Sequence, residues 1–380
     1  MMLSSKRHLF EVPEDVCYLN CAYMSPQLHS VRAAGEKALA LKAQPWRITT
    51  PDFFEEPERS RELFARIAGG DADGVAILPS VSYGMAVAAA NVPLQEGQNI
   101  LVLEDQFPSN IYPWREAARR RGANLVTVPR PADYDWTAAI LERIDEETAL
   151  VAVPNCHWTD GSLVDLIPIG ERVREVGAAL VVDATQSLGA HPLDVSKMKP
   201  DFLVSAAYKW LLGPYSLGFM YVGDSYRAGV PVEHNWLARE HSEDFARLVD
   251  YRDAYQPGAR RYDVGERSNF VLLPMANTAM QQVLDWGVDN ISETIGNLTG
   301  QIERQAAEHG IRTTPSGRRG RHMIGLQLGP AAPKDLAARL ASEDVHVSVR
   351  GNSVRVSPHL YNTESDVPRL FEALTKLVGK

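Results

Sequence analysis

Cysteine and long apolar runs are both scarce in this 380-residue sequence. Cys17, Cys21 and Cys156 are too few for a disulfide framework, and their spacing matches no paired metal-ligand motif. No apolar run approaches the roughly 20 residues that a membrane-spanning helix needs, and the first residues lack the apolar core of a signal peptide. These absences predict a cytoplasmic protein with no membrane contact and no metal site.

Positive charge is scarce as well. The chain carries 39 Lys and Arg residues against 48 Asp and Glu residues, a net charge of −9. Because binding to nucleic acid requires a basic surface, no nucleic acid partner is expected, and the basic clusters at 119–122 and 317–322 suit a solvated helix end or loop tip. The glycine-rich motifs of dinucleotide and nucleotide triphosphate sites are also missing.

What the sequence does contain is a series of short apolar runs rich in β-branched residues. Apolar on both faces and separated by helical stretches, such runs are typical of strands buried in a mostly parallel sheet. Six of them lie at residues 74–78, 99–103, 124–128, 149–153, 179–183 and 202–206. A seventh run, 217–222, follows too closely for a helical crossover, so we expect it to join the same sheet in the antiparallel direction. The class is therefore α/β.

The C-terminal third has a different pattern. Residues 225–268 show little periodicity and much charge, which we interpret as an irregular excursion at a subunit contact. A long helical pattern begins at residue 270, and period-two strands, an intervening helix and a closing helix follow. We therefore predict an N-terminal segment (1–20), a large domain (21–268) and a small α+β domain (269–380).

Polar residues follow several of the predicted strands. Lys209 comes just after one strand, Asp183 ends another, and Ser82, Phe107 and the stretch 155–161 follow three more. Each has an ordinary interpretation, such as a helix cap for Asp183 or a surface lysine for Lys209. Together they suit pyridoxal phosphate, which needs an amine, a carboxylate for its ring nitrogen, a helix N-terminus for its phosphate and a flat face for its ring.

Residues 181–222, read as "VVDATQSLGAHPLDV…PDFLVSAAYKWLLGPYSLGFMYV", resemble the core signature of the class V aminotransferase-like, fold-type I pyridoxal phosphate enzymes. That family includes cysteine desulfurases, selenocysteine lyases, kynureninases and isopenicillin N epimerase. The resemblance extends over nearly the whole chain. It implies a mostly parallel seven-stranded sheet between helices, pyridoxal 5'-phosphate as cofactor, an aldimine on Lys209, and Asp183 beside the pyridine nitrogen.

The resemblance also implies roles for residues in other matching segments. Residues 79–89 resemble the phosphate-binding turn, residues 104–114 the ring-stacking segment, and residues 155–161 the loop beneath the cofactor. The implied cofactor contacts are Val81, Ser82, Phe107, His157, Thr159, Gln186, Ser205 and Tyr208. The implied substrate contacts are Arg355, which would bind a carboxylate, and Ala22 and Tyr23.

Two departures from the family pattern change what we expect. Desulfurases carry a nucleophilic cysteine shortly before the substrate-binding arginine, whereas no cysteine follows Cys156 here. We therefore expect no thiol near Arg355 and no persulfide chemistry. The resemblance implies a homodimer in which a Gly-Thr pair reaches the partner's phosphate, but this chain has Gly265 and Glu266. Because a carboxylate repels a phosphate, Ser268 or Asn269 would take that role.

The sequence thus predicts a pyridoxal phosphate enzyme that acts on an amino acid or related amine, with an aminotransferase as the first choice. A lyase without a catalytic cysteine, either a C–S β-lyase or a kynureninase-like C–C hydrolase, is the alternative, and racemisation stays open. Phe107 and Tyr208 resemble kynureninase, whereas Gln186 resembles the desulfurases. A non-catalytic binding protein of the same fold is disfavoured because Lys209, Asp183 and Arg355 are all present.

Overall fold

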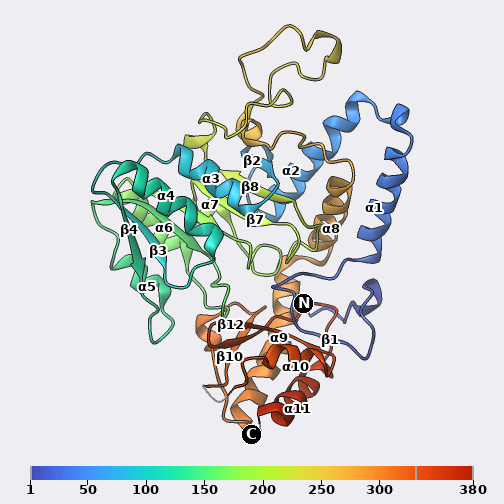
Figure 1. Cartoon of the computed structure of the whole chain (residues 1–380), viewed down its shortest axis with the longest axis vertical. Helices are drawn as coiled ribbons and strands as arrows, with labels where there is room; N and C mark the ends of the chain where they lie inside the picture. Colours follow the sequence, from blue (N-terminus) through green and yellow to red (C-terminus); the bar gives the residue numbers. More distant parts are fainter. Residues whose placement is uncertain (1, 330–331, 379–380) are drawn as a thin grey trace.

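The computed structural model describes residues 2–329 and 332–378 of the chain. Its centre is a seven-stranded sheet with the order β2-β8-β7-β6-β5-β3-β4 (Figure 1). The strands are β2 (Val75–Leu78), β3 (Asn99–Leu103), β4 (Asn124–Val128), β5 (Thr148–Pro154), β6 (Ala179–Asp183), β7 (Phe202–Ala206) and β8 (Gly218–Val222). These are the seven predicted runs, which confirms the sheet and the α/β class.

The direction of each strand also follows the prediction. Strands β3 to β7 pair in parallel, whereas β8 pairs antiparallel with both β7 and β2. The parallel strands β5, β6 and β7 are buried along their whole length, as sheets covered on both faces require. A fold-type I architecture is thereby confirmed.

Helices cover both faces of this sheet (Figure 1). Because successive strand residues point to opposite faces, Ile77 packs in one core with Phe64, and Leu78 packs in another with Met85. The first face is covered by α2 (Glu55–Ala68), α6 (Leu166–Glu175) and α8 (Leu272–Trp286), and the second by α3 (Val81–Asn91) and α4 (Tyr112–Arg121). Further helices are α1 (His29–Lys42), α5 (Trp136–Leu141) and α7 (Val195–Met198).

A second lobe is built around a four-stranded antiparallel sheet with the order β12-β13-β10-β9. Its strands are β9 (Arg312–Thr313), β10 (Ile324–Gln327), β12 (Ser348–Arg350) and β13 (Ser353–Val356), and its helices are α9 (Val288–Glu308), α10 (Leu336–Ala341) and α11 (Asp366–Val378). The N-terminal strand β1 (Cys17–Tyr18) pairs in parallel with β11 (Val345–His346), so residues from near the N-terminus are part of this lobe (Figure 1). The predicted domain boundaries at 20/21 and 268/269 stay predictions.

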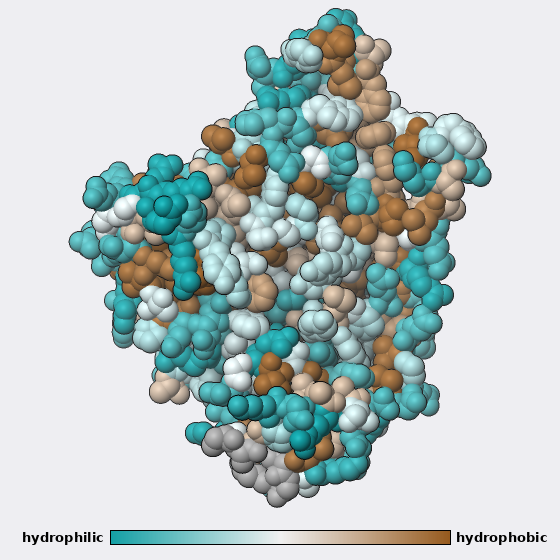
Figure 2. Space-filling view, viewed as in Figure 1, coloured by the Kyte–Doolittle hydropathy of each residue, from teal (hydrophilic) through white to brown (hydrophobic). Residues whose placement is uncertain are grey.

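Between β8 and α8 the chain projects from the large sheet as an irregular loop, here called the projecting segment (residues 230–257; top of Figure 1). On this loop Val249 is 76% and Tyr251 93% exposed. In Figure 2 the end of the loop carries a brown patch among hydrophilic residues. No helix in the described part of the chain is long and apolar enough to cross a membrane.

Candidate active site

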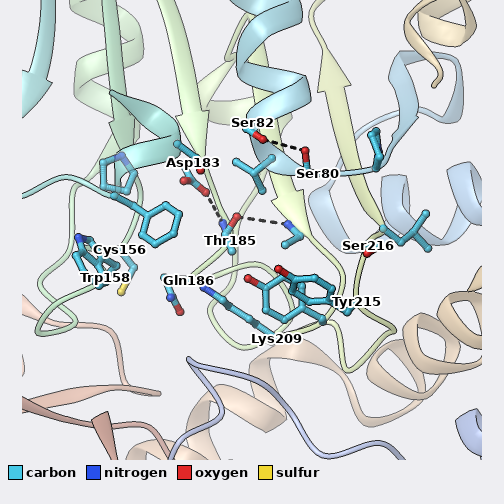
Figure 3. A pocket seen from close by; sticks show the side chains of 18 of the residues that line it. Ser80, Ser82, Cys156, Trp158, Asp183, Thr185, Gln186, Lys209, Tyr215 and Ser216 are labelled. Carbon is cyan, nitrogen blue, oxygen red and sulfur yellow. Dashed lines mark hydrogen bonds between the residues drawn. The ribbon is translucent and has the colours of Figure 1, made fainter. Parts of the chain in front are cut away.

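A cavity of about 290 Å³ lies at the carboxyl ends of β5, β6 and β7 (Figure 3). Pro154, Asp183 and Ala206, which end those three strands, all line it, because parallel neighbours end at the same edge of a sheet. The lining also includes seven residues that the sequence predicted: Val81, Ser82, Phe107, Asp183, Gln186, Tyr208 and Lys209.

The amine of Lys209 projects into this cavity (Figure 3). Its Nζ lies 5.6 Å from the ring centroid of Phe107 and 5.5 Å from that of Tyr208, and it makes no hydrogen bond or ion pair among the described residues. Burial, and next the positive charge of Arg355, lower the pKa of Lys209 to about 7. An amine with that pKa is available as a nucleophile near neutral pH.

Asp183 is a buried carboxylate with no salt-bridge partner in the part of the chain that the structure describes. Its Oδ1 accepts a hydrogen bond from the backbone of Thr185 at 3.0 Å (Figure 3). Burial raises the pKa of Asp183, against the opposing effects of the Thr185 hydrogen bonds and of Lys209. A buried carboxylate of this kind is a good partner for a protonated ring nitrogen, because a cation relieves the cost of its burial.

The opposite side of the cavity is the start of α3. Ser80 is the N-cap: its Oγ accepts from the backbone N–H of Tyr83 at 3.2 Å and lies 2.9 Å from the Oγ of Ser82 (Figure 3). The free N–H groups of the first turn, the helix dipole and two hydroxyls make this end an anion site. Val81 and Ser82, which the sequence predicted as phosphate contacts, lie in this first turn. Ser80 lies beside them and was not predicted.

Aromatic rings form much of the remaining wall. The ring of Phe107 meets that of Trp158 edge to face, with centroids 5.4 Å apart, and the indole Nε1 of Trp158 donates to the carbonyl of Asp105 at 2.6 Å. Tyr208 packs against Tyr215 at 4.6 Å. The cavity therefore offers flat apolar surface for a planar group.

Arg355 lies in β13, behind Trp158, and is not itself a lining residue. It is 1% exposed, its Nη1 donates to the carbonyl of Trp158 at 2.7 Å, and its Nε has no hydrogen-bond partner. Burial, and next Arg350, lower the pKa of Arg355 to about 9. A buried guanidinium with an unused edge is suited to a carboxylate.

Three of the predicted cofactor contacts do not line the cavity. The ring of His157 stacks on Trp136 at 5.4 Å and its Nε2 lies 3.1 Å from the carbonyl of Glu104, while Thr159 accepts from Arg130. The hydroxyl of Ser205 donates to the carbonyl of Ala206. His157 and Thr159 thus stabilise the loop that carries Trp158, and they do not line the cavity themselves.

Ala22 contacts Gln186, which lines the cavity. The amide Nε2 of Gln186 donates to the carbonyl of Ala22 at 3.1 Å, and its Oε1 accepts from the indole of Trp210. Tyr23 is 55% exposed, and its phenol lies close enough to Tyr208 and Arg350 to affect the pKa of each. Ala22 is fully buried and Tyr23 is largely exposed, and neither is a lining residue of the cavity.

The expectation that no thiol lies near Arg355 is wrong. Cys156 lines the cavity, and Cys156 and Cys21 both act on the pKa of Arg355. However, burial raises the pKa of Cys156, and it raises that of Cys21 to about 12, so both sulfurs stay protonated and are poor nucleophiles. Cys156 belongs to the 155–161 loop that the resemblance set beneath the cofactor. The expectation considered only residues close to Arg355 in the sequence, whereas the fold brings this distant loop against β13.

Of the residues that the sequence analysis considered for a partner's phosphate, Gly265, Ser268 and Asn269 make hydrogen bonds within the chain. The N–H of Gly265 donates to Glu233 at 2.5 Å, Ser268 donates to the carbonyl of Phe53, and Asn269 accepts from the first turn of α8. Glu266 takes a positive φ of 59°.

The missed lining residues include Thr185, Trp158, Ser80, Tyr215 and Ser216. Ser80 and Thr185 each stand next to a predicted residue, Val81 and Gln186, and Trp158 lies inside the predicted 155–161 loop. In the described part of the chain, no group of three or more His, Cys, Asp or Glu side chains could hold a metal ion.

The comparisons with known proteins agree with this geometry. The chain is 27% identical over 356 residues to an uncharacterized aminotransferase, YcbU, of Bacillus subtilis (89% of this chain, 87% of the relative), and 25% identical over 336 residues to isopenicillin N epimerase of Streptomyces clavuligerus (85% and 84%). Among solved structures, the complex of the cystine C–S lyase C-DES with its product cysteine persulfide superimposes with a TM-score of 0.85 at 17% identity (96% of this chain, 98% of that chain).

The fold and the cavity define a fold-type I pyridoxal 5'-phosphate enzyme. The family model for aminotransferase class-V matches residues 49–370, so the chain belongs to that family and its cofactor is pyridoxal 5'-phosphate. The residues present fit this group: the helix N-terminus suits its phosphate, Asp183 its ring nitrogen, and the unpartnered amine of Lys209 its aldehyde.

Proposed function

We propose that this enzyme is an aminotransferase that acts on an α-amino acid, with Lys209 as the residue that holds the cofactor. The observation that carries the proposal is the amine of Lys209, buried, unpaired and with its pKa lowered to about 7, between the carboxylate of Asp183 and the arginine of β13. The Bacillus subtilis relative, named as an uncharacterized aminotransferase, supports the same reaction class.

Each residue has a distinct part in this chemistry. When bound, the cofactor supplies an electron-accepting ring that stabilises negative charge at the substrate's α-carbon. Asp183 would pair with its ring nitrogen, Phe107 would offer an apolar face to the ring, and the first turn of α3 with Ser80 and Ser82 would hold its phosphate. The Nζ of Lys209 would hold the cofactor and, as a free amine, would accept the proton of the substrate's α-carbon and return it to another carbon.

Arg355 positions the substrate for that proton transfer. Since Nη1 donates to the carbonyl of Trp158 and Nε has no partner among the described residues, the guanidinium keeps unused donors for the α-carboxylate. Binding there would orient the α-carbon toward Lys209.

The alternative is a C–S or C–C lyase that uses no catalytic cysteine. Support for it comes from Phe107 and Tyr208 and from the similarity to a cystine C–S lyase, whereas the similarity to an epimerase supports racemisation. A lyase and an aminotransferase both need Lys209 and Asp183, so variants of these residues cannot distinguish the two reactions. Their products can. A homodimer in the cytoplasm stays a prediction for either.

The test is a substrate screen on the holoenzyme with and without a keto acid acceptor. Transamination requires the acceptor and conserves the amino group, whereas a lyase releases ammonia, sulfide or a cleaved side chain without it. In parallel, borohydride reduction and mass spectrometry are expected to place a pyridoxyl group on Lys209 and none on a Lys209→Ala protein. A pyridoxyl mass on another lysine would overturn the assignment.

A further inference from the structure

Two arginines of the small lobe converge on one cavity residue, Trp158. The guanidinium of Arg350, in β12, lies over the indole ring at 5.8 Å from its centroid, and Arg355, in the paired strand β13, donates to the carbonyl of the same residue. Trp158 lines the cavity, so both cations stand at its wall on the side of the small lobe.

Neither arginine has a carboxylate partner among the described residues. The arginines of the chain that lie near acids form clear ion pairs, for example Arg61 with Asp263 and Arg319 with Glu303, whereas no salt bridge involves Arg350, Arg355 or Lys209. Each of the two arginines also lies close enough to lower the pKa of Lys209. Asp183 is the one carboxylate that acts on this group of cations, through Lys209, and the pyridine ring is its natural partner.

A substrate with a single carboxylate leaves this charge unbalanced. One carboxylate can occupy the free edge of Arg355, after which Arg350 still carries an unpaired positive charge. Arg350 is half-buried, and the one hydrogen bond it makes within the chain runs from Nη1 to the carbonyl of Val349 at 2.8 Å. Burial lowers the pKa of Arg350, so an anion that reached it would relieve a desolvated cation.

We propose that Arg350, seated on Trp158, binds a second anionic group of the substrate, so that the preferred substrate is an amino acid with a carboxylate in its side chain. The proposal deepens the proposed function and rests on it in one respect, because it gives the α-carboxylate to Arg355. Trp158 then acts as the specificity wall: its ring holds Arg350 in place, and its indole N–H is tied to the carbonyl of Asp105.

Binding of acids that lack an amine tests this directly, because such acids cannot enter the reaction. The holoenzyme is titrated by calorimetry with succinate, glutarate and adipate, and with butyrate, valerate and caproate as monoacids of matched length. At least one diacid is expected to bind about tenfold more tightly than its monoacid, as one charge-assisted contact supplies. Arg350→Gln should abolish that preference and leave the monoacid affinities unchanged.

Arg339→Gln is the matched control, since it removes the same charge from the same lobe on the exposed face of α10, where Arg339 pairs with Asp335. It should keep the diacid preference. Equal affinities for all diacids and monoacids in the parent protein would overturn the proposal, and so would a preference that survives Arg350→Gln. Arg350→Lys keeps the charge without the planar fork, and a partial preference there supports a charge contact.

The proposed function fails by a different result, namely no pyridoxyl group on Lys209 after borohydride, or no turnover of any amino acid. The cofactor's visible absorbance, followed in every variant, shows whether the site is assembled.

Discussion

The amine of Lys209 lies close to two cations, Arg355 and Arg350, and both lower its pKa. In the cofactor-free protein, we expect capture of added pyridoxal 5'-phosphate to speed up with pH around an inflection near 7, far below the ordinary lysine value of 10.5. Only the neutral amine attacks the aldehyde, and the neutral form dominates above the pKa. Stopped-flow absorbance between pH 5.5 and 9 measures this inflection.

Arg355→Gln supplies the control for that measurement. Removing a nearby positive charge stabilises the ammonium form, so the inflection should move to higher pH. An inflection that stays in place would show that burial alone sets the pKa of Lys209, and one near 10 in the parent protein would contradict the buried amine.

Asp183→Asn is expected to lower kcat at least about a hundredfold, the order seen when one electrostatic contact is removed from an active site. The amide has no negative charge to hold the ring nitrogen protonated. Cofactor affinity should fall much less, because the turn before α3 and Lys209 are intact. Steady-state kinetics and fluorescence titration of the cofactor separate the two effects.

Asp165→Asn is the matched control for this change. Asp165 caps α6 through its Oδ1 and the N–H of Ile167, with no part in the cavity. If both asparagine variants kept full activity, Asp183 would be no more than a helix cap.

At the scale of residues, the sequence predicted those site residues that come at the end of a strand. Asp183 and Lys209 could be predicted because the carboxyl ends of buried parallel strands meet at one edge. His157 and Thr159 have the same kind of position, but their partners, Trp136 and Arg130, come from other parts of the chain. Only the folded structure brings those partners close and turns the two side chains away from the cavity.

At the scale of elements, the predictions held best for the apolar strands. All seven runs form strands within a residue or so of the predicted bounds, because burial on both faces leaves little choice of register. The sequence shows one long helical pattern from residue 270, but the structure has two helices there, α8 and α9. They are separated at Gly287, whose φ is 78°. Gly287 ends α8 with a positive φ and a ψ of 126°, a backbone conformation that glycine adopts without a steric penalty.

Helix α3 depends on a close approach to the sheet at Gly84. A Cβ at this position would lie 2.7 Å from the side chain of Leu78 and 2.8 Å from that of Val204. Gly84→Ala should therefore push α3 off the sheet, reduce the free energy of unfolding by about 1–3 kcal/mol and weaken cofactor affinity, because the phosphate turn moves with the helix. Chemical denaturation and a cofactor titration measure the two effects.

Gly300→Ala in α9 is the control, as its nearest neighbour would be the Arg304 side chain at 3.7 Å. Alanine in an open helical position is expected to be neutral or stabilising. A Gly84→Ala protein with parental stability and cofactor affinity would show that α3 tolerates the displacement.

At the scale of the whole molecule, contacts between residues far apart in the sequence complete the second lobe and join it to the large sheet. Strand β1 pairs with β11 across more than three hundred residues, and Arg355 of β13 reaches the loop of Trp158. Strands of two residues carry almost no periodicity, so no pattern in the sequence could have predicted that pairing. The contact at Trp158 nevertheless matters for the cavity, because there a residue of the second lobe, Arg355, donates to a residue that lines it.

The last expectation concerns the projecting segment and the predicted dimer. Val249 and Tyr251 stand on it with most of their surface exposed, a costly arrangement for an isolated loop. We expect the protein to sediment as a two-fold homodimer at micromolar concentration, and the combined change Val249→Asp and Tyr251→Asp to shift it toward monomer. The unfolding temperature of the large domain should change little, since neither side chain belongs to a buried core.

Ile167→Asp on α6 is the matched control, because Ile167 is also exposed but lies on the large domain away from the segment. It should leave the dimer intact. A fully active monomer would remove the dimer prediction, and a dimer that survives the double change would place the subunit contact elsewhere. The N–H of Gly265 already donates to Glu233 of this segment. If activity falls when the dimer is lost, a residue other than Gly265 of the partner subunit would therefore complete the site.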